Sequence, residues 1–271
     1  MNSKIKRLCE CSIMIALASV LSLCKLVDFP YGGSVTLASM LPIVLIAYRH
    51  GTGVGLISGL LYGVMQQLLG LNTLTYAPTP EAVVAIIVLD YLFAFAVIGL
   101  AGLFRNLHAS PATRLTSGAL FACLCRYILH VIAGATVWAG LSIPTEAALF
   151  YSLGYNATYM IPETLLLCAV AFYLASVVDF RADIPTPVRR EKADGGSLSL
   201  AGAFFSAALA VVVPLVLLFP ALQNAESGAF DFSGLATFDY TPSIVCCALF
   251  LALALVLFLV ARAENKKSAN D

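Results

Sequence analysis

A run of 23 residues, AVVAIIVLDYLFAFAVIGLAGLF (residues 82–104), contains a single charged residue, Asp90. A helix that crosses the hydrocarbon core of a bilayer needs about 20 mostly apolar residues, so this run predicts a membrane span. The whole chain has the same character, with 61% hydrophobic residues, 11% charged residues and a mean hydropathy of +0.94. A soluble domain has about 25% charged residues. We therefore predict an all-α, polytopic membrane helix bundle.

The apolar stretches divide the chain into a large domain and a tail. Eight stretches are candidate spans: 9–27, 36–48, 52–70, 82–104, 115–139, 147–178, 198–220 and 243–262. The second is short and has glycines before it, so we expect it to be irregular or tilted. The composition predicts a six-helix membrane domain over 1–180, a charged cytoplasmic linker over 181–197 and a two-helix membrane extension over 198–271.

The basic residues indicate the orientation of the chain in the membrane. Cytoplasmic loops carry an excess of Lys and Arg. A cytoplasmic N-terminus places 13 of the 15 basic residues on the inner side: Lys4, Lys6, Arg7, Arg49, Arg105, Arg114, Arg181, Arg189, Arg190, Lys192, Arg262, Lys266 and Lys267. We therefore expect both termini in the cytoplasm. The net charge is zero, and no nucleic-acid partner is indicated.

Small residues recur at four-residue spacing on two of the expected helices. Glycine occupies positions 51, 55, 59 and 63, and Ser12 and Ala16 form a shorter version of this pattern. Such a face permits close approach of two helices. It fits either tight packing inside the bundle or contact with a partner subunit.

Few ionisable residues lie inside the expected spans, and such residues usually mark function. The helical rise of 1.5 Å per residue places Asp90 roughly 12 Å from the outer end of its span, with His130 and Asn156 each at about 13 Å. Three polar side chains at one depth, below Tyr151 and the single tryptophan, Trp138, predict a ligand pocket open to the outside. The alternative is that each is an ordinary polar group satisfied inside the bundle.

The composition of this pocket suggests a cationic aromatic ligand. Asp90 supplies a carboxylate, and the rings of Tyr91, Tyr151 and Trp138 would attract a cation. Arg126 and Glu163 lie deeper and fit a structural ion pair at the pocket floor, although ligand contact or proton coupling remains an alternative.

Catalysis and cofactor binding are not indicated by the sequence. It contains no nucleotide-binding P-loop and no catalytic triad or paired catalytic carboxylates. Nearly all eight cysteines fall in apolar runs, as small buried residues do, so we expect neither a metal site nor a cofactor.

Residues 1–180 resemble the thiamine-specific S components of energy-coupling-factor (ECF) transporters. The resemblance rests on four stretches: GGSVTLASMLPI (32–43), DYLFAFAVIGLAGLFR (90–105), RYILHVIAGATVW (126–138) and YSLGYNATYMIPE (151–163). It implies a bacterial cell-membrane protein that binds thiamine from outside and joins a transmembrane T component and two ATPase subunits. One alternative is an S component that binds a different cationic or pyrimidine-type vitamin. The other is a standalone secondary transporter.

The resemblance also implies roles for particular residues. The vitamin contacts of the family correspond to Asp90, Tyr91, His130, Gly134, Trp138, Tyr151 and Asn156. The loop around Tyr31, Gly33 and Ser34 would close over the ligand, and Ser12 and Ala16 would contact the T component. Some members have Glu in place of Asp90 and Trp in place of Gly33. In this chain the ring of Tyr31 or Tyr76 would replace the ring of that tryptophan.

Overall fold

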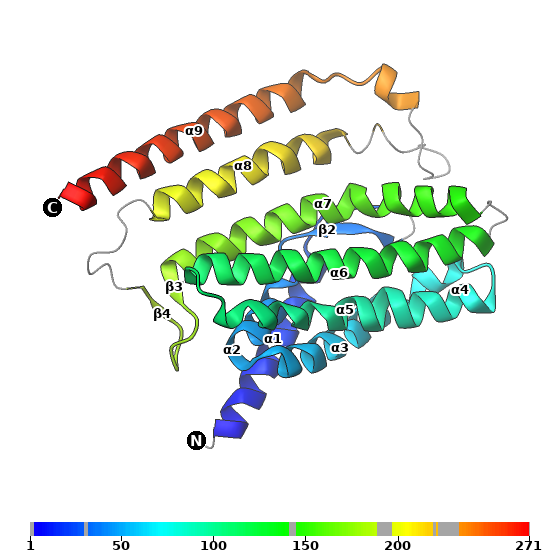
Figure 1. Cartoon of the computed structure of the whole chain (residues 1–271). Helices are drawn as coiled ribbons and strands as arrows, with labels where there is room; N and C mark the ends of the chain where they lie inside the picture. The colour runs from blue at the N-terminus through cyan, green and yellow to red at the C-terminus, as the bar shows by residue number, and fades with distance from the viewer. Residues whose placement is uncertain are drawn as a thin grey trace. The chain divides into compact units, whose positions relative to one another are not determined.

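The computed structural model describes residues 3–29, 32–140, 145–188, 197–218, 221 and 233–270, and they form the all-α membrane bundle that the sequence predicts (Figure 1). Six of its helices are long and apolar enough to cross a membrane: Thr52–Leu69, Pro80–Asn106, Pro111–Val137, Glu146–Val177, Leu198–Leu218 and Thr241–Lys266. The protein is therefore a multi-pass membrane protein.

The chain forms two compact units, Met1–Leu167 and Cys168–Asp271. The division falls inside one long helix, α7 (Thr145–Val177). The predicted boundaries at residues 180 and 197 were drawn from a change in composition, and they remain a prediction.

The first unit begins with α1 (Ser3–Leu23) and a short antiparallel hairpin of β1 (Lys25–Asp28) and β2 (Ser34–Thr36). Next come α2 (Leu41–His50), α3 (Thr52–Leu69) and the 3-10 helix η2 (Leu71–Tyr76). The span Pro80–Asn106 consists of α4 (Pro80–Ala85), η3 (Ile86–Phe93), α5 (Ala94–Ala96) and η4 (Val97–Asn106). It is followed by α6 (Pro111–Gly140) and α7.

The second expected span, 36–48, is instead the end of the hairpin followed by α2. This helix has 10 residues, so it is about 15 Å long and too short to cross a bilayer by itself. Together with the hairpin it brings the chain back along α1, because Arg49 at its end pairs with Glu10 in the first half of α1. Leu41 to Tyr48 are all buried. The apolar run was therefore a core helix, and apolar composition alone cannot distinguish the two.

The first helix also differs from its expected range. It ends at Leu23, not at residue 27, because Lys25 to Asp28 pair with the second strand. Its first half carries four charged residues, Lys4, Lys6, Arg7 and Glu10. Glu10 forms an ion pair with Arg49 at the end of α2.

The glycine ridge of α3 packs inside the bundle. A Cβ atom on Gly55 would lie 2.9 Å from Cα of Gly99, and one on Gly63 would lie 2.7 Å from the carbonyl oxygen of Tyr91. Only glycine permits α3 to approach the span 80–106 so closely. Of the two readings of the ridge, packing within the bundle is the one that the structure supports.

In the second unit, a small hairpin of β3 (Val178–Asp179) and β4 (Thr186–Pro187) precedes α8 (Ser197–Leu218). A 3-10 turn, η6 (Ser233–Ala236), then leads to α9 (Thr241–Asn270). Helices α8 and α9 run side by side (Figure 1), and the hydroxyl of Ser206 donates to the carbonyl of Phe250 at 2.8 Å.

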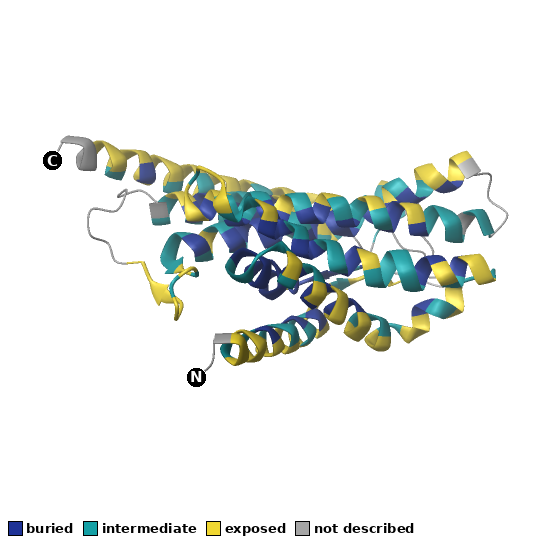
Figure 2. Cartoon of the chain, turned by 60° about the horizontal axis from the view of Figure 1, so that its bottom comes forward, coloured by how far each residue is buried: buried dark blue, intermediate teal, exposed yellow. Residues whose placement is uncertain are grey.

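Helix α9 contacts its neighbour along one narrow seam. Apart from Cys246, the buried and half-buried positions of the helix are spaced alternately by four and three residues: Ser243, Cys247, Phe250, Ala254, Leu257, Ala261 and Glu264. This spacing is the repeat of a two-helix coiled coil. Most other positions of α9 are exposed, as Figure 2 shows for the helix that ends at the C-terminus. Their side chains are mainly apolar and suit a lipid environment.

Candidate binding site

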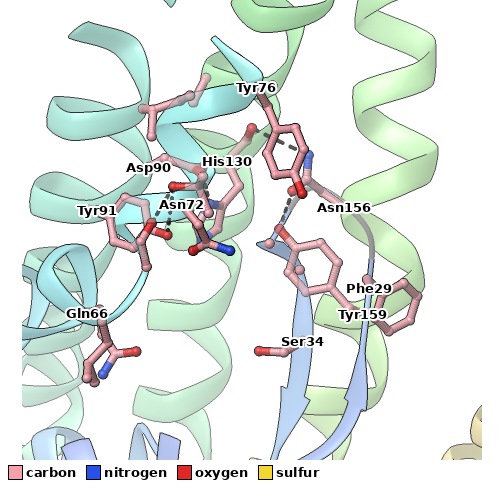
Figure 3. Close-up of a pocket in the computed structure, with 18 of the residues that line it drawn as sticks. Phe29, Ser34, Gln66, Asn72, Tyr76, Asp90, Tyr91, His130, Asn156 and Tyr159 are labelled. Atoms are coloured by element: carbon pink, nitrogen blue, oxygen red, sulfur yellow. Dashed lines mark hydrogen bonds and ion pairs between the residues drawn. The ribbon is translucent and has the colours of Figure 1, made fainter. Parts of the chain in front are cut away.

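A cavity of about 680 Å³ lies in the first unit, a volume that falls in the usual range for small-molecule sites (Figure 3). Its lining comes from the end of α1, the hairpin, α3 and η2, the span 80–106, α6 and α7, and every lining residue precedes Leu167. Ten of the residues proposed from sequence line it: Gly33, Ser34, Tyr76, Asp90, Tyr91, Arg126, His130, Gly134, Asn156 and Glu163.

Asp90 reaches the cavity from η3, a π-helical stretch. A π-helix widens the turn and occurs frequently at functional sites. The carboxylate of Asp90 forms a short hydrogen bond with Nδ1 of His130 on α6. A carboxylate only accepts, so the proton lies on Nδ1. Nε2 of His130 is buried and has no hydrogen-bond partner among the described residues.

Tyr91 follows Asp90 and forms one wall of the cavity. Its ring stacks on Phe95, with 6.2 Å between ring centroids and 26° between the ring planes. Its hydroxyl lies 3.2 Å from Oγ1 of Thr73 in η2. These contacts hold the ring in one orientation, which gives a planar ligand a fixed surface.

Asn156 of α7 reaches the cavity beside His130 (Figure 3). Its Nδ2 donates to the carbonyl of Ser152 at 2.8 Å and to Oγ of Ser152 at 3.1 Å, and its Oδ1 accepts from the hydroxyl of Tyr159. A Cβ atom on Gly134 of α6 would overlap Oγ of Ser152 and lie 3.3 Å from Nδ2 of Asn156. Glycine at 134 therefore permits α7 to bring both polar side chains against α6.

Arg126 and Glu163 form a buried ion pair against the cavity. Nη1 of Arg126 lies 3.2 Å from Oε2 of Glu163, and the guanidinium stands 4.5 Å above the centre of the Phe95 ring. Oε1 of Glu163 accepts from the hydroxyl of Thr36 at 2.8 Å. The two charges neutralise each other, and Thr36 ties the hairpin to this pair.

The hairpin also contacts α7 at Gly33. The backbone N–H of Gly33 donates to the hydroxyl of Tyr155 at 3.3 Å. A Cβ atom on Gly33 would lie 2.7 Å from the Tyr159 ring. The two tyrosines therefore occupy the space beside position 33, where some members of the family that residues 1–180 resemble have tryptophan.

Some residues proposed from sequence lie elsewhere. Tyr151 does not line the cavity, but its ring stacks on Tyr155 with 6.5 Å between centroids and 6° between planes. Ser12 and Ala16 are exposed on α1 and outside the cavity lining. Tyr31 and the side chain of Trp138 lie outside the described residues.

Comparisons with known proteins identify the family of the chain. The thiamine transporter protein family (Thia_YuaJ) matches residues 8–180. The chain is also 35% identical over 184 residues to the thiamine transporter ThiT of Bacillus subtilis (strain 168), which covers 64% of this chain and 91% of that protein. The chain belongs to the thiamine transporter family.

A solved structure of ThiT from Listeria monocytogenes has the same fold, with a TM-score of 0.52 and 26% identity. The match covers 64% of this chain and 95% of that chain. The residues after 180, including α8 and α9, lie beyond the part that the family matches.

Five aromatic residues that line the cavity of this thiamine transporter family member were not predicted from the sequence: Phe29, Tyr62, Phe95, Tyr155 and Tyr159. Tyr155 and Tyr159 line the cavity from α7, and their rings meet edge to face at 5.7 Å. The signal was present, because residues 151, 155 and 159 are four apart and lie on one face of a helix. Gln66 and Thr73 also line the cavity, and neither has a distinctive local pattern.

Proposed function

We propose that this chain is the substrate-binding S component of an ECF transporter, which captures thiamine from outside the cell and is not itself an enzyme. The observation that carries the proposal is the pairing of Asp90 with His130 beside the fixed ring of Tyr91 in one cavity.

The chemistry of the cavity suits thiamine, which joins a cationic thiazolium ring to an aminopyrimidine. Asp90 would accept from the pyrimidine amino group or balance the cation. A cation over a desolvated aromatic face gains about 1–2 kcal/mol. The proposed contacts are Asp90, Tyr91, His130, Gly134, Trp138, Tyr151 and Asn156. Tyr31, Gly33, Ser34 and Tyr76 would form the closing side of the site.

ATP-driven uptake by this chain would require partners, because the sequence contains no P-loop. We assign the T component and the two ATPase subunits of an ECF transporter to this role. Ser12 and Ala16 are exposed on α1 and are available for contact with the T component. The distribution of Lys and Arg supports a bacterial cell-membrane location with both termini in the cytoplasm.

Isothermal titration of the purified full-length protein with thiamine tests the binding step. We expect saturable binding with a Kd below about 10 µM, which corresponds to roughly −7 kcal/mol. Competition with other cationic and pyrimidine vitamins tests the choice of ligand. Folded protein that gives no heat with thiamine would contradict the proposal.

Uptake measurements distinguish an S component from a standalone secondary transporter. Cells that express this chain alone should bind thiamine and accumulate little, and co-expression with the T component and both ATPases should give ATP-dependent uptake. Equal accumulation with and without these partners would favour the standalone transporter.

A further inference from the structure

The amide of Asn156 has its orientation dictated by its neighbours. The hydroxyl of Ser152 donates to the carbonyl oxygen of Val131 at 2.8 Å, so Oγ of Ser152 has only acceptor capacity left. The carbonyl oxygen of Ser152 is also only an acceptor, and it lies 2.8 Å from the Asn156 amide. The amide group that faces Ser152 must therefore be the nitrogen.

The opposite side of the amide is fixed as well. Oδ1 of Asn156 accepts from the hydroxyl of Tyr159, as the dashed line in Figure 3 shows. Asn156 and Tyr159 are 4% and 5% exposed, and Ser152 is completely buried. A rotated amide would bring its oxygen against the Ser152 carbonyl without water to compensate, which is unfavourable in a buried site.

The polarity of this side of the cavity follows from these contacts. One hydrogen on Nδ2 of Asn156 bonds Ser152, and the carbonyl of His130 lies 3.4 Å from the same nitrogen. Oδ1 retains a second lone pair, and the phenol oxygen of Tyr159 retains acceptor capacity. The carboxylate of Asp90, which pairs with Nδ1 of His130, adds further acceptor oxygens to the same cavity. Hydrogen-bond acceptors therefore outnumber donors on this side of the cavity.

We infer that Ser152 and Tyr159 are positioning residues, which hold Asn156 as a hydrogen-bond acceptor and make the site select a heteroaromatic ligand with a ring amino group over its oxo counterpart. This inference rests on the proposed function and identifies the part of the ligand that α7 reads. A site that hydrogen-bonds one substituent rejects an analogue that leaves its polar groups unpaired.

The test compares two compounds by isothermal titration on the full-length protein. Thiamine carries the 4-amino group on its pyrimidine ring, and oxythiamine carries a carbonyl oxygen there. The variant is Tyr159→Phe, which removes the hydroxyl that Oδ1 of Asn156 accepts from. The matched control is Tyr127→Phe, which removes a hydroxyl that donates to the carbonyl of Leu153 on α7 and lies outside the cavity lining.

We expect the natural protein to prefer thiamine by at least about tenfold in Kd, and Tyr159→Phe to narrow the ratio to about threefold or less. Tyr127→Phe should keep both the affinity and the ratio of the natural protein. Ser152→Ala removes the Oγ acceptor at the other end of the amide and keeps the Ser152 carbonyl, so it should narrow the ratio by a smaller factor. It therefore tests the inference if Tyr159→Phe does not fold.

Two results would overturn the inference in distinguishable ways. If Tyr159→Phe and Ser152→Ala bind both compounds with the ratio of the natural protein, the two residues do not set the polarity of Asn156, and the proposed function stands. If the natural protein binds neither compound, the proposed function fails and this inference fails with it.

Discussion

Arg126 of α6 and Glu163 of α7 form a buried ion pair, with 3.2 Å between Nη1 and Oε2. The pair joins two membrane spans at the wall of the cavity. Removal of one partner leaves a buried charge without its counter-charge, which costs about 3–5 kcal/mol. We predict that Glu163→Gln lowers the unfolding free energy by about this amount, as measured by chemical unfolding in mixed micelles.

The double variant Arg126→Met with Glu163→Gln should regain most of this loss, because no charge is then left unpaired. The control is the exposed pair of Lys25 and Asp28, whose side chains are 42% and 61% exposed. Asp28→Asn should cost less than about 1 kcal/mol. A double variant as unstable as Glu163→Gln would show that the loss does not arise from an unpaired charge.

Gly134 should tolerate no side chain, because a Cβ atom there would overlap Oγ of Ser152. We predict that Gly134→Ala lowers stability by about 1–3 kcal/mol, the usual cost of overpacking, and that Ser152→Ala in the same chain restores part of it. Gly154→Ala is the matched control, because no atom lies within 4 Å of its added Cβ. Equal thermal unfolding midpoints for Gly134→Ala and Gly154→Ala would contradict this account.

The sequence predicted the span that carries Asp90 and the polar groups that meet it, because helical rise alone relates residues on different spans by depth. It did not predict that α2 is a buried core helix. It also did not predict the π-helical turn around Asp90, since no local residue pattern marks one. The contacts of Gly33 with Tyr155 and Tyr159 join residues more than 120 positions apart, and such contacts are set by tertiary packing.

The C-terminal helices should be dispensable for ligand binding. Every residue that lines the cavity lies in the first unit, and the family match ends at residue 180. We predict that a chain without residues 197–271 binds thiamine with a Kd within about threefold of the full chain, since the removed segment contributes no residue to the cavity lining. Its stability should fall, because Phe172 loses its contact with Phe204. Loss of binding in a folded truncated protein would assign the extension a role in the site.

The orientation of α1 can be measured with its own cysteines. Cys9 and Cys24 are both exposed and lie about 22 Å apart along the helix direction. The basic residues before Cys9 predict that it faces the cytoplasm. In single-cysteine variants, a membrane-impermeant maleimide applied to intact cells should label Cys24 and not Cys9. Labelling of Cys9 and not Cys24 would show that the N-terminus lies outside the cell, and it would contradict the proposed orientation of the chain.

The most direct measurement is the fluorescence of Trp138, the single tryptophan, during titration with thiamine. The account predicts saturable quenching that Asp90→Asn weakens by at least about tenfold in Kd, because a charge-assisted hydrogen bond is lost. The control is Asp239→Asn, an exposed carboxylate outside the cavity whose pKa is lowered by hydrogen bonds from Thr241. Thiamine should quench the fluorescence of this control with the same Kd as in the natural protein. Unchanged quenching in Asp90→Asn, or no quenching in the folded natural protein, would contradict the central claim that Asp90 anchors thiamine in this cavity.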